Sequence, residues 1–339
     1  MDKPSLKKLR KGKNLNTKYA AVAVILIAIL SVSLIYVYYV NQTGSQPEQG
    51  SIKIIDSQGY ETTLPSVPQK IISLAPSVTP ILYEIGVGDK IVGLTSYDDS
   101  PYDFSAWFEA GNMTCVGGFS TPNLETITSL QPDIIFSTNV NDESIPNMRE
   151  LGLKVIVVGP KSINEILDTI NLIGKATGAE TKAAEVVNTL SAEISEVQEK
   201  IAEANIIDKV TLHYEVYYDE SGIMTAGSGS WLNNVFETAG GINIFSDLTA
   251  EWPNTSSEVI VQRNPSVIIL PSNMGTGVPF YGSVDEVKAR PGWSTIDAII
   301  NDRLFVIEQD LLSEPGIRVA EQVQVVAACL YPQLFNSTP

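Results

Sequence analysis

The stretch AETKAAEVVNTLSAEISEVQEKIAEA, residues 179–204, lies near the middle of the 339-residue chain and decides the fold. Its apolar side chains recur at the three- and four-residue spacing of one helical face, and Glu, Lys, Gln and Asn fill the other. No Pro or Gly interrupts it, so it predicts one helix about 39 Å long. Taken alone, it is compatible with an ordinary surface helix. The sequence on either side favours a rod between two lobes.

Short apolar runs alternate with amphipathic segments before and after this helix. Four runs before it are near-continuous in apolar residues: KIISLA (70–75), KIVGLT (90–95), DIIFST (133–138) and KVIVVG (154–159). Such runs are typical of a parallel sheet covered on both faces. We therefore predict an α/β fold with two lobes, 52–178 and 206–335, each a mostly parallel sheet flanked by helices. The long helix at 179–205 joins the lobes.

The first 51 residues have the features of an anchor and a tether. Residues 1–18 carry seven Lys or Arg and one Asp, and 19–40 are uncharged and long enough to span a bilayer. We predict a cytoplasmic flank, a transmembrane anchor and a flexible tether at 41–51, with the rest of the chain outside the cell. A cleaved signal peptide is the alternative, but the apolar run is longer than usual and no small-x-small cleavage site follows it. No Cys lies near the apolar run, so a lipid-modified N-terminus is disfavoured.

The charge and composition of the chain limit the partners and metal ions that it is expected to bind. The chain has a formal net charge of −17, and its basic residues concentrate in the predicted flank, which argues against a nucleic-acid partner. His213 is the single histidine and lies in a strand-like run, so a bare Zn²⁺ or Mn²⁺ site is disfavoured and a packed histidine is favoured. Cys115 and Cys329 are too few for a disulfide scaffold, and the sequence leaves both a bridge and two free thiols open.

One spacing occurs in both halves of the chain. An aromatic residue, a glutamate and a proline precede an apolar run at the same intervals each time. The two sets are Phe119, Glu125, Pro132 and 134–136, and Trp252, Glu258, Pro265 and 267–269. This repeat indicates that both lobes contain the same loop, helix and strand.

Four motifs, in this order, resemble the solute-binding proteins of ABC importers for vitamin B12, ferric siderophores and haem. They are residues 70–101, 117–137, 250–270 and 291–319, and the likeness covers about 52–334. The resemblance implies a class III binding protein, in which one long helix joins two lobes. It also implies a permease partner with ATPase subunits, and neither enzymatic activity nor a resident cofactor. The transported ligand would be a cobalamin-like corrinoid or an iron chelate.

The resemblance also assigns roles to individual residues. Glu125 and Glu258 match the glutamates that dock onto the permease, although each could simply favour its own helix N-terminus. Phe119 and Trp252 match the aromatic positions that sandwich the corrin, and Asp310 matches a polar contact. Glu314 departs from the pattern, which has a basic residue near there, and this weakens the cobalamin assignment.

The full ligand-binding prediction includes aromatic and polar residues on strand-end loops. It comprises Tyr97, Asp98, Phe119, Trp231, Trp252, Tyr281 and Asp310. Flat aromatic faces with a few polar atoms suit a large planar ligand, although core packing is an alternative for each aromatic residue. The same loops contain few Lys or Arg, which favours a neutral or weakly charged ligand over a strongly anionic siderophore.

Two other classes of function compete with transport. A receptor domain that senses a ligand would have the same features. An extracellular hydrolase would need a nucleophile with a base, a metal cluster or paired carboxylates, and only the carboxylates are available. The glycines near 227 and 275 lack the spacing of a phosphate-binding loop. We therefore predict an anchored extracellular binding protein.

Overall fold

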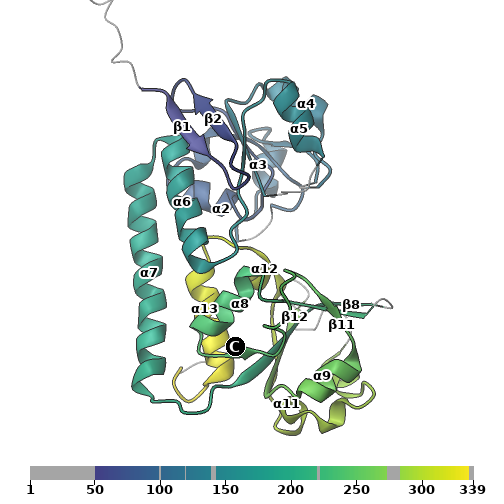
Figure 1. The fold of residues 1–339 in the computed structure, drawn as a ribbon. Coiled ribbons are helices and arrows are strands. Elements are labelled where there is room, and N and C mark those ends of the chain that lie inside the picture. The colour runs from purple at the N-terminus through teal and green to yellow at the C-terminus, as the bar shows by residue number, and fades with distance from the viewer. Residues whose placement is uncertain are drawn as a thin grey trace, which may run out of the picture. The chain divides into compact units, whose positions relative to one another are not determined.

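The computed structural model describes residues 50–98, 101–118, 120–138, 143–219, 222–272 and 283–335 (Figure 1). Met1–Gly50 and Ser51–Pro339 are separate units, and the following description concerns the second. Within the described ranges, no helix is long and apolar enough to cross a membrane. The predicted flank at 1–18 and the anchor at 19–40 lie outside those ranges, as does nearly all of the tether.

The first half contains a five-stranded parallel sheet. Its strands lie in the order β5 (Thr114–Cys115), β4 (Ile91–Leu94), β3 (Ile71–Ser73), β6 (Ile134–Ser137) and β7 (Val155–Val157). An antiparallel hairpin of β1 (Ile52–Ile55) and β2 (Glu61–Leu64) precedes it. Every residue of β3, β6 and β7 is buried, which explains their near-continuous apolar sequence.

Helices cover both faces of this sheet. Neighbouring residues of one strand, such as Ile134 and Ile135, belong to different hydrophobic clusters because side chains alternate between the faces of a strand. The helices are α2 (Thr79–Glu84), α3 (Ser105–Glu109), α4 (Leu124–Leu130), α5 (Ser144–Glu150) and α6 (Ile163–Thr177), with a 3-10 turn at Gly88–Lys90. α4 and α5 contribute to one cluster, and α2 and α6 to the other.

The second half contains a six-stranded mixed sheet. Its strands lie in the order β11 (Asn254–Thr255), β9 (Gly222–Thr225), β8 (Thr211–Asp219), β12 (Val267–Ser272) and β13 (Leu304–Glu308), and β10 (Ile242–Asn243) also pairs with β8. The pairings among β8, β10, β12 and β13 are parallel, whereas β9 and β11 pair antiparallel. The predicted α/β fold of parallel strands flanked by helices is therefore confirmed, with an antiparallel edge that the sequence analysis did not specify.

Six α-helices accompany the second sheet in the described residues. They are α8 (Trp231–Thr238), α9 (Ser257–Arg263), α10 (Val284–Lys288), α11 (Asp297–Ile300), α12 (Gln309–Ser313) and α13 (Val319–Leu330), with a 3-10 turn at Trp293–Thr295. α9, α10 and α11 pack on one face of the sheet, while α8, α12 and α13 belong to the large cluster on the other.

The central helix prediction is confirmed, because α7 spans Glu180–Glu203. Figure 1 shows α7 beside α6 and α13, and it contacts both helices. α6 approaches closely because it has Gly174, where an added Cβ would lie 2.4 Å from Cβ of Ala183. The large hydrophobic cluster runs from Ile71 of the first sheet through Leu190 of α7 to Leu212 of the second. The helix is therefore part of a continuous core, and the lobe boundaries at 178 and 206 remain predictions.

The repeated spacing corresponds to a repeated structure. α4 and α9 each have seven residues and end at a left-handed residue, Gln131 with φ 51° and Asn264 with φ 45°. Each leads into a central strand of its sheet, β6 or β12. The two halves therefore contain the same helix and strand at equivalent places.

Candidate functional site

A cavity of about 430 Å³ lies where loops from the two sheets meet. The lining residues are Thr138, Gly159, Pro160, Lys161, Tyr214, Val216, Trp231, Glu251, Trp252, Leu312, Ser313 and Pro315. Thr138 follows β6, and the segment 159–161 follows β7. Leu312 and Ser313 end α12, which comes directly after β13, and Pro315 follows α12. These are the carboxyl ends of parallel strands, where α/β sheets bind ligands.

Two tryptophans form one wall of the cavity. Trp231 begins α8, whose N-cap Ser230 accepts a hydrogen bond from the Leu232 N–H. Its ring meets Trp252 edge to face, with centroids 5.2 Å apart and an interplanar angle of 78°. Trp231 is 4% exposed and Trp252 is half-buried. Within the described residues, the buried Nε1 of Trp231 has no hydrogen-bond partner.

The glycine loop 227–229 holds the segment that carries Glu251 and Trp252. The Gly227 N–H donates to the Glu251 carbonyl at 3.1 Å, and the Ser228 N–H donates to Leu248 at 2.8 Å. A Cβ at Gly227 would lie 2.2 Å from the Ala250 carbonyl oxygen, so no side chain fits there. The glycines therefore let the loop pack closely against residues 248–251, which fixes the position of the cavity wall.

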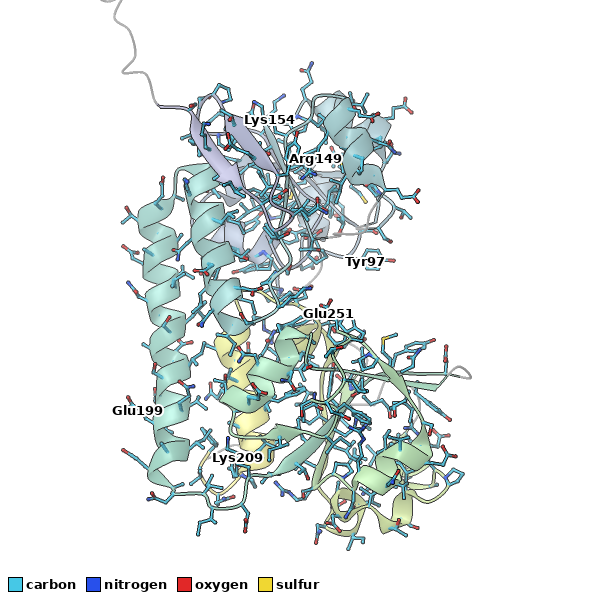
Figure 2. The ribbon with its side chains drawn as sticks, in the orientation of Figure 1. Tyr97, Arg149, Lys154, Glu199, Lys209 and Glu251 are labelled. Atoms are coloured by element: carbon cyan, nitrogen blue, oxygen red, sulfur yellow. The ribbon has the colours of Figure 1, made fainter. Side chains whose placement is uncertain are left out.

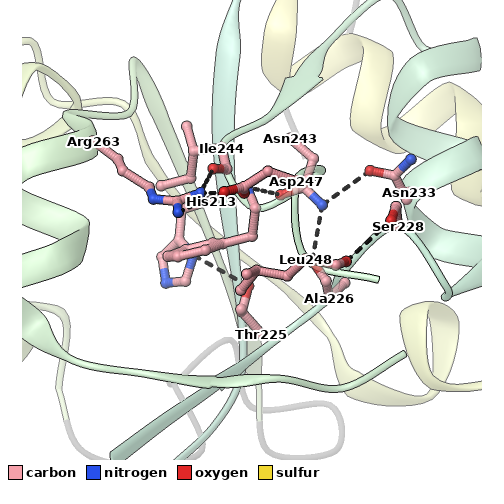
Figure 3. A network of polar contacts seen from close by, with 11 residues as sticks. His213, Thr225, Ala226, Ser228, Asn233, Asn243, Ile244, Asp247, Leu248 and Arg263 are labelled. Atoms are coloured by element: carbon pink, nitrogen blue, oxygen red, sulfur yellow. Dashed lines mark hydrogen bonds and ion pairs between the residues drawn. The ribbon is translucent and has the colours of Figure 1, made fainter. Parts of the chain in front are cut away.

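A buried polar network lies behind this wall (Figure 3). Asn243 Nδ2 donates to Asn233 Oδ1 at 3.0 Å and to the Ala226 carbonyl at 2.8 Å. Its Oδ1 accepts from the Phe245 N–H at 3.0 Å. A buried amide with these partners fixes the relative positions of α8, β10 and the residues before the glycine loop.

His213 belongs to the core and not to the cavity. It is fully buried in β8, and its ring lies edge-on to Phe245, with centroids 5.6 Å apart. Burial and the nearby Arg290 lower its pKa to about 3, so the imidazole is neutral at physiological pH. The prediction of a packed histidine is confirmed. Within the ranges the structure describes, no three His, Cys, Asp or Glu gather in a way that could hold a metal ion.

The cavity lining includes one cation and one anion among the described residues. Lys161 comes from the loop after β7 in the first half, and Glu251 comes from the segment before Trp252 in the second. Burial raises the pKa of Glu251, and the nearby Lys161 charge lowers it by a smaller amount. Figure 2 shows Glu251 between the two sheets.

Two of the seven predicted ligand residues, Trp231 and Trp252, line the cavity together. Tyr97 is 56% exposed on the loop after β4 and is not among the lining residues (Figure 2). Phe119 and Tyr281 lie outside the described residues.

Asp98 serves its own loop. It is buried, and its carboxylate accepts hydrogen bonds from the Thr95 N–H at 2.8 Å, the Thr95 hydroxyl at 2.6 Å and the Thr79 hydroxyl. These bonds tie the end of β4 to the start of α2. The described hydrogen bonds of this carboxylate are to its own loop and to α2, and its predicted ligand contact stays a prediction.

Asp310 lines a different, water-sized recess of about 10 Å³, together with Ser77, Glu314 and Arg318. Here the two halves touch: a Cβ added to Gly316 would lie 2.8 Å from the Ser77 carbonyl oxygen. The departure noted at Glu314 also falls in this recess and not in the large cavity. The predicted ligand contact of Asp310 stays a prediction.

Glu125 and Glu258 occupy equivalent exposed positions in the first turns of α4 and α9. The Asn123 side chain caps α4 by accepting a 3.0 Å hydrogen bond from the Thr126 N–H. Hydrogen bonds from Ser256 and from a backbone N–H lower the pKa of Glu258, which keeps it ionised. Both glutamates are therefore available to a partner, and their docking role stays a prediction.

Sequence reasoning missed most of the lining. Lys161, Thr138 and Glu251 were not predicted, although Thr138 directly follows β6, Lys161 lies on the loop after β7 and Glu251 precedes Trp252. The strand-end rule could have found them if applied to every strand. Both cysteines are free thiols: Cys115 is exposed, and Cys329 is buried with a pKa raised to about 12 by burial.

Comparison with known proteins places this site in a family context. The model of the family described as "Periplasmic binding protein" matches residues 71–311. An uncharacterized ABC transporter substrate-binding lipoprotein of Bacillus subtilis is 29% identical over 84% of this chain and 87% of its own. A vitamin B12-binding protein of Vibrio cholerae is 26% identical over 79% and 90%. A possible iron-binding, periplasmic solute-binding protein of Staphylococcus epidermidis is 28% identical and superposes with a TM-score of 0.65 over 78% of this chain and 99% of its own.

Proposed function

This chain belongs to the periplasmic binding protein family, and we propose that it is the membrane-anchored, extracellular solute-binding component of an ABC importer. It captures a cobalamin-like corrinoid or an iron chelate, such as a siderophore or haem, and delivers it to a permease. Its similar relatives are substrate-binding proteins and not enzymes, so a hydrolase is set aside.

The cavity at the strand ends is the observation that carries the proposal. Its volume falls within the range of roughly 300–1,000 Å³ that is usual for small-molecule sites. Residues from both sheets line it, and the paired indoles of Trp231 and Trp252 offer apolar surface to a flat ligand. A ligand held there contacts both halves at once, as a carrier between solution and permease requires.

The cavity is largely preformed. The Ile163 N–H, at the start of α6, donates to Asn234 Oδ1 of α8 at 3.0 Å. This bond connects the first-half loop that carries Lys161 to the helix that begins with Trp231. Together with the contact between Ser77 and Gly316, it limits how far the halves can separate. Ligand capture therefore needs only a small closing motion, in contrast to large hinge closure.

The proposed ligand classes follow from the lining and from what the relatives are named for. One Lys and one Glu give the described lining no net charge, which suits a neutral or weakly charged chelate better than a polyanion. The relatives include a vitamin B12-binding protein and a possible iron-binding protein. No resident cofactor is part of this proposal.

The remaining parts of the proposal concern the membrane and the permease. Residues 19–40 anchor the protein in a single pass, and the tether at 41–51 lets the folded part reach the transporter. Glu125 and Glu258 dock onto basic pockets of the permease, which works with its ATPase subunits. Carboxylates pair well with arginine because a guanidinium can donate two parallel hydrogen bonds.

Titration of the full-length protein in detergent tests this function. Cyanocobalamin, haem and a ferric hydroxamate are added separately, and binding is measured by calorimetry. At least one should bind with a Kd below about 1 μM, equivalent to about −8 kcal/mol. If all three fail to bind, the ligand assignment is wrong.

A further inference from the structure

Lys161 and Glu251 are the charged residues among the described residues that line the cavity. Lys161 comes from the first half of the chain and Glu251 from the second. Neither was singled out by the sequence. Each is next to a feature that fixes its backbone: the Lys161 N–H donates to Glu165 Oε2 at 2.8 Å, and Gly227 holds the Glu251 carbonyl. Both charges are therefore presented to a ligand from defined positions.

The Glu251 side chain is half-buried, and its carboxylate receives no hydrogen bond from the described residues. Lys161 interacts with it as a nearby charge. A carboxylate withdrawn from water gains when a bound molecule supplies an N–H or O–H donor.

Lys161 has the opposite need. Its ammonium group gains when a bound molecule supplies an acceptor oxygen. The indole N–H of Trp231 is buried, so it belongs to the wall and is not offered to a ligand. The described lining thus offers one anionic acceptor and one cationic donor together with the apolar surface of Trp252.

Building on the proposed function, we infer that Glu251 and Lys161 select ligands whose rim carries carboxamide groups over ligands whose rim carries carboxylates. A carboxamide supplies an N–H donor to Glu251 and a carbonyl acceptor to Lys161. A carboxylate has no donor to offer and places a second negative charge beside Glu251. The two negative charges, one on the ligand and one on Glu251, repel each other in a half-buried site.

A matched pair of ligands tests the inference on the full-length protein in detergent. Dicyanocobinamide and dicyanocobyrinic acid share one corrin ring, and their rims carry carboxamides and carboxylates respectively. Haem, which carries two carboxylates, and its diamide, in which both are converted to carboxamides, repeat the comparison for iron. The carboxamide member should bind at least about tenfold more tightly, a factor that corresponds to about 1.4 kcal/mol.

Variants assign the preference to the two side chains. Glu251→Gln should reduce the preference by about tenfold, because the amide accepts and donates without charge. Lys161→Gln should increase the preference for carboxamide ligands. Glu251 is then the only charged residue in the described lining, and it repels a carboxylate ligand. Glu199→Gln on α7 and Lys209→Gln, both exposed and away from the cavity lining (Figure 2), should leave the preference unchanged.

The outcomes separate this inference from the proposed function. Tight binding of haem in preference to its diamide, or a preference that Glu251→Gln does not alter, overturns the inference and leaves transport standing. Failure of all four ligands and of cyanocobalamin to bind overturns both. Binding of either carboxamide ligand with a preference that depends on Glu251 supports the inference.

Discussion

At the scale of single residues, burial decides which acidic groups serve the fold and which serve the site. Asp98 is a predicted ligand residue and Glu251 adjoins one, Trp252, yet the two carboxylates have different partners. Asp98 accepts bonds from two threonines and is 4% exposed, whereas Glu251 lines the cavity without a hydrogen bond from the described residues. The first is a structural carboxylate, and the second is available to a ligand.

Replacement of Asp98 by Ala tests that distinction. Thr79 and the Thr95 N–H would lose a charged acceptor in a buried place, so the free energy of unfolding should fall by about 2–4 kcal/mol. Urea denaturation measures this, with the exposed Asp208→Ala as the control. Ligand affinity of the folded fraction should stay within about twofold. A stable Asp98→Ala protein that has lost its ligand would support the predicted binding role of Asp98 instead.

Glu251 should affect stability in a pH-dependent way. Burial raises its pKa in the folded state, so the ionised form costs stability above the ordinary carboxyl pKa. Glu251→Gln should therefore raise the free energy of unfolding at pH 7 by less than about 1 kcal/mol, because solvent screens a half-exposed group. The gain should disappear as the pH falls below the unfolded-state pKa, where Glu251 is protonated in both states. A loss of stability at pH 7 would mean that attraction to Lys161 outweighs burial.

At the scale of elements, close backbone approach at glycines positions both the central helix and the cavity wall. Gly174 brings α6 against α7, and Gly227 seats the segment before Trp252. Neither glycine adopts a left-handed conformation. Each is required because a neighbouring atom occupies the place of a Cβ, which no sequence pattern reveals.

Gly174→Ala tests the helix contact. Alanine favours a helix over glycine by about 1 kcal/mol, but its Cβ would lie 2.4 Å from Cβ of Ala183. Overpacking of about 1–3 kcal/mol should exceed the propensity gain, so thermal unfolding should occur at a lower temperature. The double variant with Ala183→Gly removes the clash and should recover most of the loss. A Gly174→Ala protein as stable as the wild type would show that the helices can move apart freely.

Gly227→Ala tests the cavity wall. The new Cβ would collide with the Ala250 carbonyl and displace Glu251 and Trp252, so ligand affinity should fall by at least about tenfold. Gly59→Ala, which also strains the backbone but has no neighbour within 4 Å, serves as the control. Calorimetric titration compares the two. Equal affinity in both variants would mean that the glycine loop does not set the wall.

The elements were largely predictable, and the reasons are physical. Uninterrupted amphipathic periodicity predicted α7 to within one residue at its start and two at its end, and buried parallel strands are recognisable as apolar runs. The antiparallel edge of the second sheet was not specified, because β9 and β11 are short and their pairing depends on long-range contacts. The cavity lining was mostly missed. Nothing in the local sequence marks Thr138 or Lys161 as lining residues, because the cavity forms only where their loops meet the second half of the chain.

At the scale of the whole molecule, two equivalent helices present one glutamate each. α4 and α9 have equal lengths and equivalent ends, so Glu125 and Glu258 lie at corresponding positions of the two halves. A permease that recognises both must engage the two halves together. The proposed docking would therefore depend on the relative arrangement of the two halves.

Replacement of both glutamates by Ala tests docking apart from capture. Neither residue lines the cavity, so ligand affinity should stay within about twofold, while uptake by cells carrying the permease should be abolished. Glu199→Ala on α7 is the matched control and should transport normally. Loss of ligand binding in the double variant would show that these residues have been assigned to the wrong surface.

Binding by Trp252→Ala and Trp107→Ala, compared with wild type, tests most directly whether the cavity captures the ligand. Trp107 is 40% exposed on α3 and does not line the cavity. With the ligand that binds the full-length protein most tightly, Trp252→Ala should raise Kd by at least about tenfold and Trp107→Ala should leave it unchanged. An unchanged Kd in Trp252→Ala would place the ligand elsewhere and contradict the account.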